Sequence, residues 1–150
     1  MEPEIVQVPA FTVVGVKYRG QNKEGEIPRM WCEQFLPRAA EIPSKKEPWV
    51  FYGVMGNYDE ATGEFDYVAG AEVEDASEIP EGMVSWSIPD NTYAAFDCTL
   101  PTLHEAFHHI YQEWLPTSDY RRAPGPEFEY YPPGFHEDQR MRLYVPVLRR

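Results

Sequence analysis

The sequence predicts an α+β protein in which two β-α-β-β units, related by a pseudo-two-fold axis, share one antiparallel sheet. Two observations predict this fold. Short runs of β-branched and aromatic residues are interrupted by two helical segments with apolar residues at three-and-four spacing, and several motifs recur half a chain apart. Both helices are expected on one face of the sheet, which leaves a ligand cleft on the opposite face or at the seam between the halves. The length of 150 residues suits a single domain covering residues 1–150.

The first half of the chain is expected to contain three strands and one helix. Pro9 breaks the segment before the first strand, and Pro37 is expected to interrupt the helix because proline lacks an N–H group. Asn57, Asp59 and Gly63 are typical of the loop that joins two strands of a hairpin. The expected elements are a strand at 11–18, a helix that begins at 27–28, and strands at 49–55 and 64–74.

The second half repeats this order after a further short strand. Thr102 is a candidate N-cap, and Glu105 lies three residues later, as in a capping box. The apolar residues of the helix that follows form one stripe, so the helix is expected to cover a sheet and to end at Pro116. Residues 117–125 are expected to form a polar loop. The expected strands are 83–88, 92–98, 127–131 and 141–148.

Four motifs recur at offsets of 77 to 80 residues. This similarity predicts an internal repeat of about residues 5–74 and 83–148. In this alignment Glu129 takes the place of Phe51. Because an acid buried without partners costs several kcal/mol, an acid at an apolar position is more often functional than accidental. The matches are Val8-Pro9 with Ile88-Pro89, Phe35-Leu36-Pro37 with Trp114-Leu115-Pro116, 48–52 with 126–130, and Tyr67-Val68 with Tyr144-Val145.

Residues 126–131 (PEFEYY) are the candidate site, because an acid lies there among aromatic residues. Alternation along a strand puts Phe128 and Tyr130 on one face and Glu127, Glu129 and Tyr131 on the other. Taken alone, this pattern favours a strand with a solvated acidic face. The comparison of the two halves favours a functional Glu129 instead.

The composition makes several classes of function unlikely. A net charge of −12 opposes direct nucleic-acid binding, which needs a basic surface. No apolar run approaches the roughly 20 residues that span a bilayer, and residues 1–4 lack the basic region of a signal peptide, so no membrane association and a cytoplasmic location are expected. Cys32 and Cys98 show no metal-binding spacing, and no glycine-rich phosphate loop is present, so no cofactor is expected.

One short motif suggests a different chemistry. His104 and His108 match the HExxH pattern of zinc hydrolases, and Glu127 follows His108 by 19 residues, where a third ligand is possible. On a helical wheel both histidines fall beside the apolar stripe rather than within it, which indicates solvated side chains. No metal site is expected.

Six stretches, taken in order over almost the whole chain, resemble the GyrI-like effector-binding domain. They are 65–73 (FDYVAGAEV), 80–83 (PEGM), 93–96 (YAAF), 110–116 (IYQEWLP), 126–130 (PEFEY) and 143–147 (LYVPV). That family includes drug-sensing domains of AraC-type and multidrug-responsive transcription activators, stand-alone binders of cationic drugs, gyrase-inhibitory proteins, and hydrolases of cyclopropane-containing toxins. Because no helix-turn-helix segment fits before residue 5 or after residue 148, the expected form is stand-alone.

The resemblance implies that Glu129 is the pocket glutamate that meets a cationic ligand, and that aromatic residues such as Tyr67 and Tyr144 contribute to the walls. Phe51, Trp86 and Tyr131 are further wall candidates. Each of the five aromatic residues fits a core position equally well. Burial in such a pocket should raise the pKa of the carboxyl group. An arriving cation would relieve the cost of the buried charge, and each ring face would add about 0.5 to 2 kcal/mol by cation–π contact.

Three functions remain open at this point. The preferred one is binding of hydrophobic, cationic small molecules by Glu129 in an aromatic pocket, with a regulator or gyrase as a protein partner. The second is hydrolysis of a cyclopropane-type electrophile, with Glu129 as the catalytic base. The third is gyrase inhibition through the acidic exterior, which would not depend on Glu129.

Overall fold

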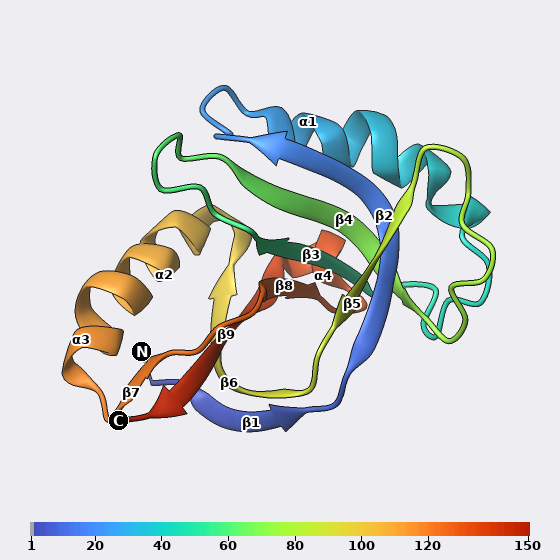
Figure 1. Ribbon diagram of the computed structural model, residues 1–150. Coiled ribbons are helices and arrows are strands. Elements are labelled where there is room, and N and C mark those ends of the chain that lie inside the picture. The colour runs from blue at the N-terminus through green and yellow to red at the C-terminus, as the bar shows by residue number, and fades with distance from the viewer. Residues whose placement is uncertain (1) are drawn as a thin grey trace.

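The computed structural model describes residues 2–150 as a curved antiparallel sheet with two helical segments packed against it (Figure 1). β-branched and aromatic residues dominate most of its strands, as their preference for a pleated, half-buried surface predicts. The strands are β1 (Glu4–Val8), β2 (Phe11–Gly20), β3 (Phe51–Gly56), β4 (Phe65–Val73), β5 (Val84–Ile88), β6 (Asn91–Thr99), β7 (Tyr120–Arg122), β8 (Glu127–Tyr131) and β9 (Arg140–Arg149).

Each of the two long helical segments is built from several shorter pieces. The first consists of α1 (Glu26–Met30), the π-helical turn η1 (Trp31–Phe35) and the 3₁₀ turn η2 (Leu36–Glu41). The second consists of η3 (Leu100–Thr102), α2 (Leu103–His109), the π-helical turn η4 (Ile110–Trp114) and α3 (Leu115–Thr117), and α4 (Phe135–Asp138) lies between β8 and β9. No helix within residues 2–150 is long and apolar enough to cross a membrane.

The prolines do not end these helices where the sequence suggested. Pro37 and Pro116 each follow a π-helical turn and lie inside the helical path, which continues to Glu41 and Thr117. A proline leaves one carbonyl group of the preceding turn without its usual N–H partner, and a wider turn accommodates that loss. The chain can therefore pass each proline with a change of helix type.

The predicted capping box at Thr102 and Glu105 is wrong by one turn. The helical path already begins at Leu100, so Thr99 is the N-cap. The Thr99 backbone N–H donates a hydrogen bond to the Thr102 hydroxyl oxygen at 3.1 Å. Thr102 itself makes no side-chain cap to α2.

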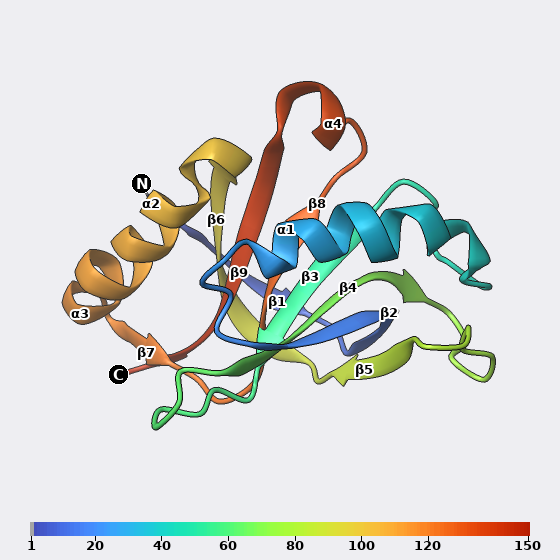
Figure 2. The same ribbon diagram turned by 90° about the horizontal axis from the view of Figure 1, so that it is seen from above.

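The strand order reads symmetrically from the two edges toward the centre: β1-β6-β9-β8-β3-β4-β2-β5. The halves meet at the central pair β3 and β8, and the edge strands are exchanged between them. β1 runs through Pro9 into β2 but pairs with β6, whereas β5 runs through Pro89 into β6 but pairs with β2. Figures 1 and 2 show how this exchange curls the sheet.

Two strands, β1 and β7, were not predicted from the sequence. The segment before Pro9, expected to be a lead-in, contains β1. The expected loop at 117–125 contains β7, a short strand that pairs with β9. Both are short, and β7 (Tyr-Arg-Arg) carries no apolar alternation that would identify it.

Both helical segments lie on the same face of the sheet, as predicted (Figure 2). Ile27, Met30 and Phe35 pack with β2 and β4, whereas Ala106 and Ile110 pack with β6 and β9. A third apolar cluster fills the opposite face, where side chains of β1, β2, β5 and β6 curl around the central strands. The core therefore has two parts under the helices and one part on the other side of the sheet.

The pairing registers correct two matches in the predicted repeat, the first of which is Tyr67 with Tyr144. Gly15 on β2 lies as many residues after Pro9 as Ala95 on β6 lies after Pro89, so these two residues correspond. Gly15 pairs with Gly70, and Ala95 pairs with Tyr144. Tyr144 is therefore equivalent to Gly70 and not to Tyr67. The sequence match of Tyr67 with Tyr144 therefore differs by three residues from the match that the strand pairing gives. Because three is an odd number, Tyr67 and Tyr144 lie on opposite faces of the sheet.

The same reasoning places Glu129 at the centre of the sheet. Tyr52 pairs with Gly70 on β4, and Phe128 pairs with Tyr144 on β9, so Tyr52 and Phe128 are equivalent. The next residues, Gly53 and Glu129, are then equivalent as well, and they pair directly with each other. The predicted match of Glu129 with Phe51 is wrong by two residues, which preserves the face but not the position.

Candidate functional site

Glu129 is buried at the seam between the two helical segments. Its side chain lies on the helix-covered face of β8, and only 5% of the residue is exposed. Glu127, two residues earlier on the same face, is 4% exposed. The alternative of a solvated acidic face is therefore wrong for this strand. Burial of two acids in neighbouring positions of one strand is costly, which marks this position as a candidate site.

Two tyrosine hydroxyl groups hold the Glu129 carboxylate. Tyr67 and Tyr131 both donate hydrogen bonds to Oε1, at 2.6 Å and 2.7 Å. The indole Nε1 of Trp31 donates in turn to the Tyr67 hydroxyl at 2.9 Å. Oε2 accepts no hydrogen bond from the residues that the structure describes, and Glu129 forms no ion pair with them. One oxygen is thus fixed by the protein, and the charge has no internal counterion.

A glycine makes room for this arrangement. A Cβ atom at Gly53 would overlap both the Tyr67 hydroxyl and Oε1 of Glu129. Gly53 lies directly across from Glu129 in the β3–β8 pair, so any side chain there would occupy the space of the carboxylate. The central pair of the sheet therefore combines an acid on one strand with an absent side chain on the other.

Burial raises the pKa of Glu129 to about 7. Removal from water is the main cause, since it disfavours the charged form, and the nearby Glu127 raises the pKa further. The hydrogen bonds from Tyr67 and Tyr131 act in the opposite direction because they stabilise the carboxylate. Near neutral pH the group is close to half ionised, so a small change in its surroundings decides its charge.

Glu127 has its own set of partners on the side of the second helical segment. Its Oε2 accepts a hydrogen bond from the Tyr111 hydroxyl, and Arg122 Nε donates to that same hydroxyl at 3.1 Å. Burial raises the pKa of Glu127, whereas the hydrogen bond from Tyr111 and the charge of Arg122 lower it. The two buried acids are thus held differently, one by hydroxyl groups alone and one with an arginine nearby.

Aromatic rings surround the acids on the helix-covered face. Tyr131 packs edge-on against Trp31 and Phe135, with ring centroids 5.2 Å and 4.8 Å apart. Phe51 pairs with Tyr131 across β3 and β8. Its ring packs edge-on against Phe35, with ring centroids 5.4 Å apart. Of the predicted wall residues, Tyr67, Tyr131 and Phe51 lie together on this face with Glu129.

Trp86 and Tyr144 do not share this location. Both belong to the cluster on the opposite face of the sheet, where Tyr144 stacks on Phe128 with centroids 4.6 Å apart. The prediction that they line the pocket of Glu129 is therefore wrong for the structure. For Tyr144 the error follows from the shifted repeat, and for Trp86 the register with Val13 sets the face.

Sequence reasoning missed three contributors to the site. Trp31 falls in the helix expected from 27–28, where no polar role was predicted, although a buried indole N–H usually needs an acceptor. Tyr111 falls in the second expected helix, whose apolar stripe was predicted only to cover a sheet. Arg122 lies on β7, which was expected to be a loop. None of the three carries a signal in the sequence that links it to β8, because the contacts join elements far apart in the chain.

The HExxH motif forms no metal site in the described part of the chain. His104 and His108 are exposed on α2, and Glu127 is engaged with Tyr111. Within residues 2–150 no group of three histidine, cysteine or acidic side chains could hold a metal ion.

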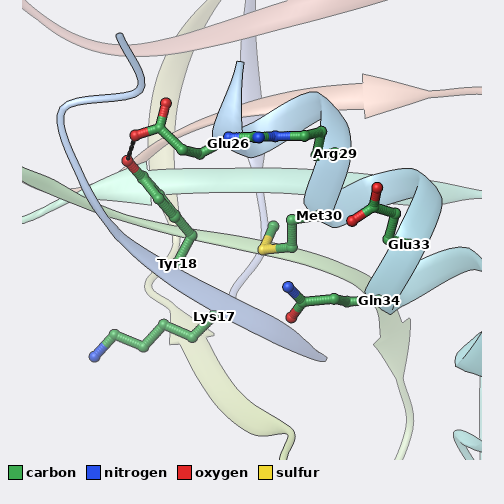
Figure 3. A pocket seen from close by; sticks show the side chains of 7 residues that line it. All are labelled: Lys17, Tyr18, Glu26, Arg29, Met30, Glu33 and Gln34. Atoms are coloured by element: carbon green, nitrogen blue, oxygen red, sulfur yellow. Dashed lines mark hydrogen bonds between the residues drawn. The ribbon is translucent and has the colours of Figure 1, made fainter. Parts of the chain in front are cut away.

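A surface hollow of about 330 Å³ lies between β2 and α1 (Figure 3). The Tyr18 hydroxyl donates to Glu26 Oε2 at 3.0 Å at its rim. None of its lining residues is a predicted site residue. The lining residues are Lys17, Tyr18, Glu26, Arg29, Met30, Glu33 and Gln34.

Comparison with known proteins identifies the family. Residues 4–147 match the family described as Cass2, integron-associated effector binding protein. The chain belongs to the Cass2 family. This membership confirms the resemblance to effector-binding domains of the GyrI-like type.

The transcriptional regulator BrlR of Pseudomonas aeruginosa is a sequence relative of this Cass2 protein. It is 38% identical over 153 residues, an alignment that covers 98% of the present chain and 56% of BrlR. The chain therefore spans little more than half the length of this curated relative.

Solved structures confirm the fold. An integron cassette protein from the mobile metagenome of Vibrio cholerae matches with a TM-score of 0.71 at 20% identity, covering 98% of this chain and 96% of that one. The protein SAV2435, solved with bound tetraphenylphosphonium, matches with a TM-score of 0.76 at 16% identity, covering 99% and 94%.

Proposed function

We propose that this Cass2 protein binds lipophilic cations at the seam between its two helical segments, with Glu129 as the charge partner. The observation that carries the proposal is a buried carboxylate with one oxygen held by Tyr67 and Tyr131 and no counterion among the described residues. A buried charge without an opposite charge is unfavourable. A cation that reached Glu129 would supply the missing charge and favour the ionised form.

The surrounding rings suit such a ligand. Aromatic faces attract cations by about 0.5 to 2 kcal/mol each, and they tolerate ligands of different shapes. Tyr67 and Tyr131 contact the acid directly, Trp31 contacts Tyr67, and Phe51 pairs with Tyr131. Because Glu129 is almost fully buried, the ligand would reach it only when some of these side chains rotate. A range of lipophilic cations, as in multidrug binding, fits this plasticity.

The relatives support the same conclusion. The family is described as effector-binding, and SAV2435 was solved with tetraphenylphosphonium, a lipophilic cation. The likeness to the regulator BrlR supports transmission of the bound state to a regulator as the protein partner, whereas gyrase, the other partner expected from the resemblance, has no such support. The proposal treats residues 1–150 as one domain of two copies, about 5–74 and 83–148, and the symmetrical strand order supports that division.

Calorimetry with a charged and a neutral ligand of similar shape tests the role of Glu129. Tetraphenylphosphonium and triphenylphosphine oxide would be titrated at pH 8 into the wild type and Glu129→Gln. We expect the substitution to weaken phosphonium binding about 10- to 100-fold, the factor that corresponds to about 1.5 to 3 kcal/mol for a charged interaction. Binding of the neutral oxide should change little. An equal loss for both ligands would contradict the proposal.

A second candidate function is favoured by the pKa of about 7 at Glu129, which suits a catalytic base near neutral pH. Glu129 would take a proton from water, the water oxygen would attack a strained ring carbon, and the carbon released by ring opening would take a proton from Tyr67 or Tyr131. The tyrosine would then recover its proton from Glu129 along their hydrogen bond. Incubation of a reactive cyclopropane compound with the wild type and Glu129→Ala separates the two functions. If the protein only binds its ligand, neither the wild type nor Glu129→Ala will turn over the cyclopropane compound.

A further inference from the structure

We propose that Glu127 is a second cation-binding carboxylate and that Arg122 is its resident counterion, so that the site accepts ligands with one positive charge in preference to two. The inference rests on the proposed function and specifies its ligand class. It concerns residues that the binding of a monocation by Glu129 does not itself require.

The two acids lie side by side on one strand. Glu127 and Glu129 are separated by one residue, so their side chains leave the same face of β8 about 7 Å apart. Both are nearly fully buried, and no other carboxylate of β8 lies between them. A rigid molecule with two cationic centres at a similar spacing could therefore meet both acids at once.

Arg122 is held close to Glu127 without contacting it directly. The Tyr111 hydroxyl lies between them, donating to Glu127 Oε2 and accepting from Arg122 Nε at 3.1 Å. The other guanidinium nitrogens donate to the carbonyl oxygens of Ala123 and Gly125. Arg122 thus cannot leave without breaking several hydrogen bonds, so its charge is a fixed part of the site.

The charges of these groups set the capacity of the site. With both acids ionised, two negative charges and the one positive charge of Arg122 leave a net charge of −1. A monocation neutralises this group, whereas a dication leaves an excess positive charge in a region with little water, which is unfavourable. Without Arg122 the net charge would be −2, and the dication would become the better match.

Both acids also lie within electrostatic reach of one exposed side chain. Tyr58 is 57% exposed, and its ring stacks on that of Phe65 with centroids 4.9 Å apart. Its pKa is raised by burial of part of the ring and then by the charges of Glu127 and Glu129, while Arg122 lowers it. Glu127, Glu129 and Arg122 therefore all lie within electrostatic reach of one phenol near the surface.

A purely structural role for Arg122 is the alternative. Its hydrogen bonds to Ala123 and Gly125 anchor the connection between β7 and β8. Arg122→Lys keeps the charge and loses much of this hydrogen bonding, whereas Arg122→Gln loses the charge and keeps a hydrogen-bonding group. The two variants therefore separate the charge from the anchoring.

The test uses three ligands of nearly identical two-ring shape. They are 4-phenylpyridine, which is neutral at pH 8, N-methyl-4-phenylpyridinium, which carries one charge, and N,N′-dimethyl-4,4′-bipyridinium, which carries two. Each would be titrated by calorimetry at pH 8 into the wild type, Arg122→Gln and Arg122→Lys, with circular dichroism and thermal unfolding as checks on folding. We expect Arg122→Gln to shift the ratio of the two cation affinities toward the dication at least tenfold relative to both the wild type and Arg122→Lys.

A ratio within twofold across the three proteins, with the monocation still bound, would overturn the role of Arg122 and leave the role of Glu129 intact. A wild type that binds neither the pyridinium ions nor tetraphenylphosphonium would overturn the proposed function and this inference together. Should Arg122→Gln not fold, Glu127→Gln carries the test. We expect it to weaken both cations at least threefold, the dication more, with 4-phenylpyridine unchanged, and an equal change for all three ligands would overturn the proposal.

Discussion

Glu129 shows how a single side chain can lower stability while it creates a binding site. Its pKa of about 7 in the folded protein lies above the ordinary value of 4.5, so a proton binds the folded form more tightly than the unfolded one. The stabilising effect of this proton is complete below pH 4.5 and is lost as the pH rises through 7. The ionised carboxylate at pH 8 therefore costs about 3 kcal/mol relative to the protonated form.

Removing the charge should recover part of that cost. We expect Glu129→Gln to raise the free energy of unfolding by about 1 to 3 kcal/mol at pH 8, because glutamine can accept the tyrosine hydrogen bonds without carrying a charge. At pH 5, where the wild-type carboxyl group is protonated, the two proteins should differ by less than about 1 kcal/mol. Urea unfolding at both pH values measures the difference. A variant that is less stable than the wild type at pH 8 would show that the carboxylate is not strained.

The central residues of the site could be predicted from sequence, but its outer partners could not. Glu129 was identified from the comparison of the two halves and from the resemblance to effector-binding domains, Tyr67 from that resemblance, and Tyr131 as a further aromatic wall candidate. Trp86 and Tyr144 fitted the same description, yet they lie on the other face. Which of two faces a strand residue occupies depends on pairing register, which a single sequence leaves open.

At the level of elements, the central pair β3–β8 is the part of the sheet that makes the site possible. Its register sets Gly53 against Glu129, and the missing side chain on β3 provides the volume that the carboxylate and the Tyr67 hydroxyl fill. Gly56 on the same strand differs, because a Cβ atom there would meet the Trp86 ring at an ordinary distance of 3.4 Å.

These two glycines offer a matched pair of substitutions. We expect Gly53→Ala to destabilise the protein by about 1 to 3 kcal/mol and to displace Glu129, since the new methyl group overlaps the carboxylate. Gly56→Ala should cost less than about 1 kcal/mol and leave cation binding unchanged. Thermal unfolding and calorimetry with tetraphenylphosphonium compare the two variants. Similar effects of both would argue against a specific fit at Gly53.

The positions of strands and helices could be predicted where the residue composition and the spacing of apolar residues indicated the same element. Strand β8 has the predicted bounds, Glu127–Tyr131, and the other long strands differ by one or two residues at their ends. The helix ends were wrong because Pro37 and Pro116 change the type of turn without stopping the helix. β1 and β7 were missed because a short strand at an edge is stabilised by its partner strand more than by its own residues.

At the level of the whole molecule, the two halves are joined by the continuous sheet, by the exchanged strands β1 and β5, and by aromatic contacts between the helical segments. Phe107 on α2 packs against the apolar clusters under both segments. Phe65 is similarly half-buried but packs against the first cluster alone. Phe107 therefore spans the seam at which Glu129 is buried.

A seam that must open for a ligand should respond to removal of this ring. We expect Phe107→Ala to lower the free energy of unfolding by about 1 to 3 kcal/mol and to accelerate association of a lipophilic cation. Phe65→Ala should lower stability to a similar extent without changing the association rate. Stopped-flow fluorescence of the wild type and both variants measures the rates. Equal acceleration in both variants would indicate general loosening instead.

The pair of Gly53 and Glu129 has a consequence for how such a binding site can arise. An assembly of two identical half-length chains with this sheet would carry the same residue at both positions. Two glutamates would crowd and repel each other, and two glycines would offer nothing to a cation. When both halves belong to one polypeptide the two positions can diverge, so that the midpoint of a nearly symmetrical scaffold holds a single acid.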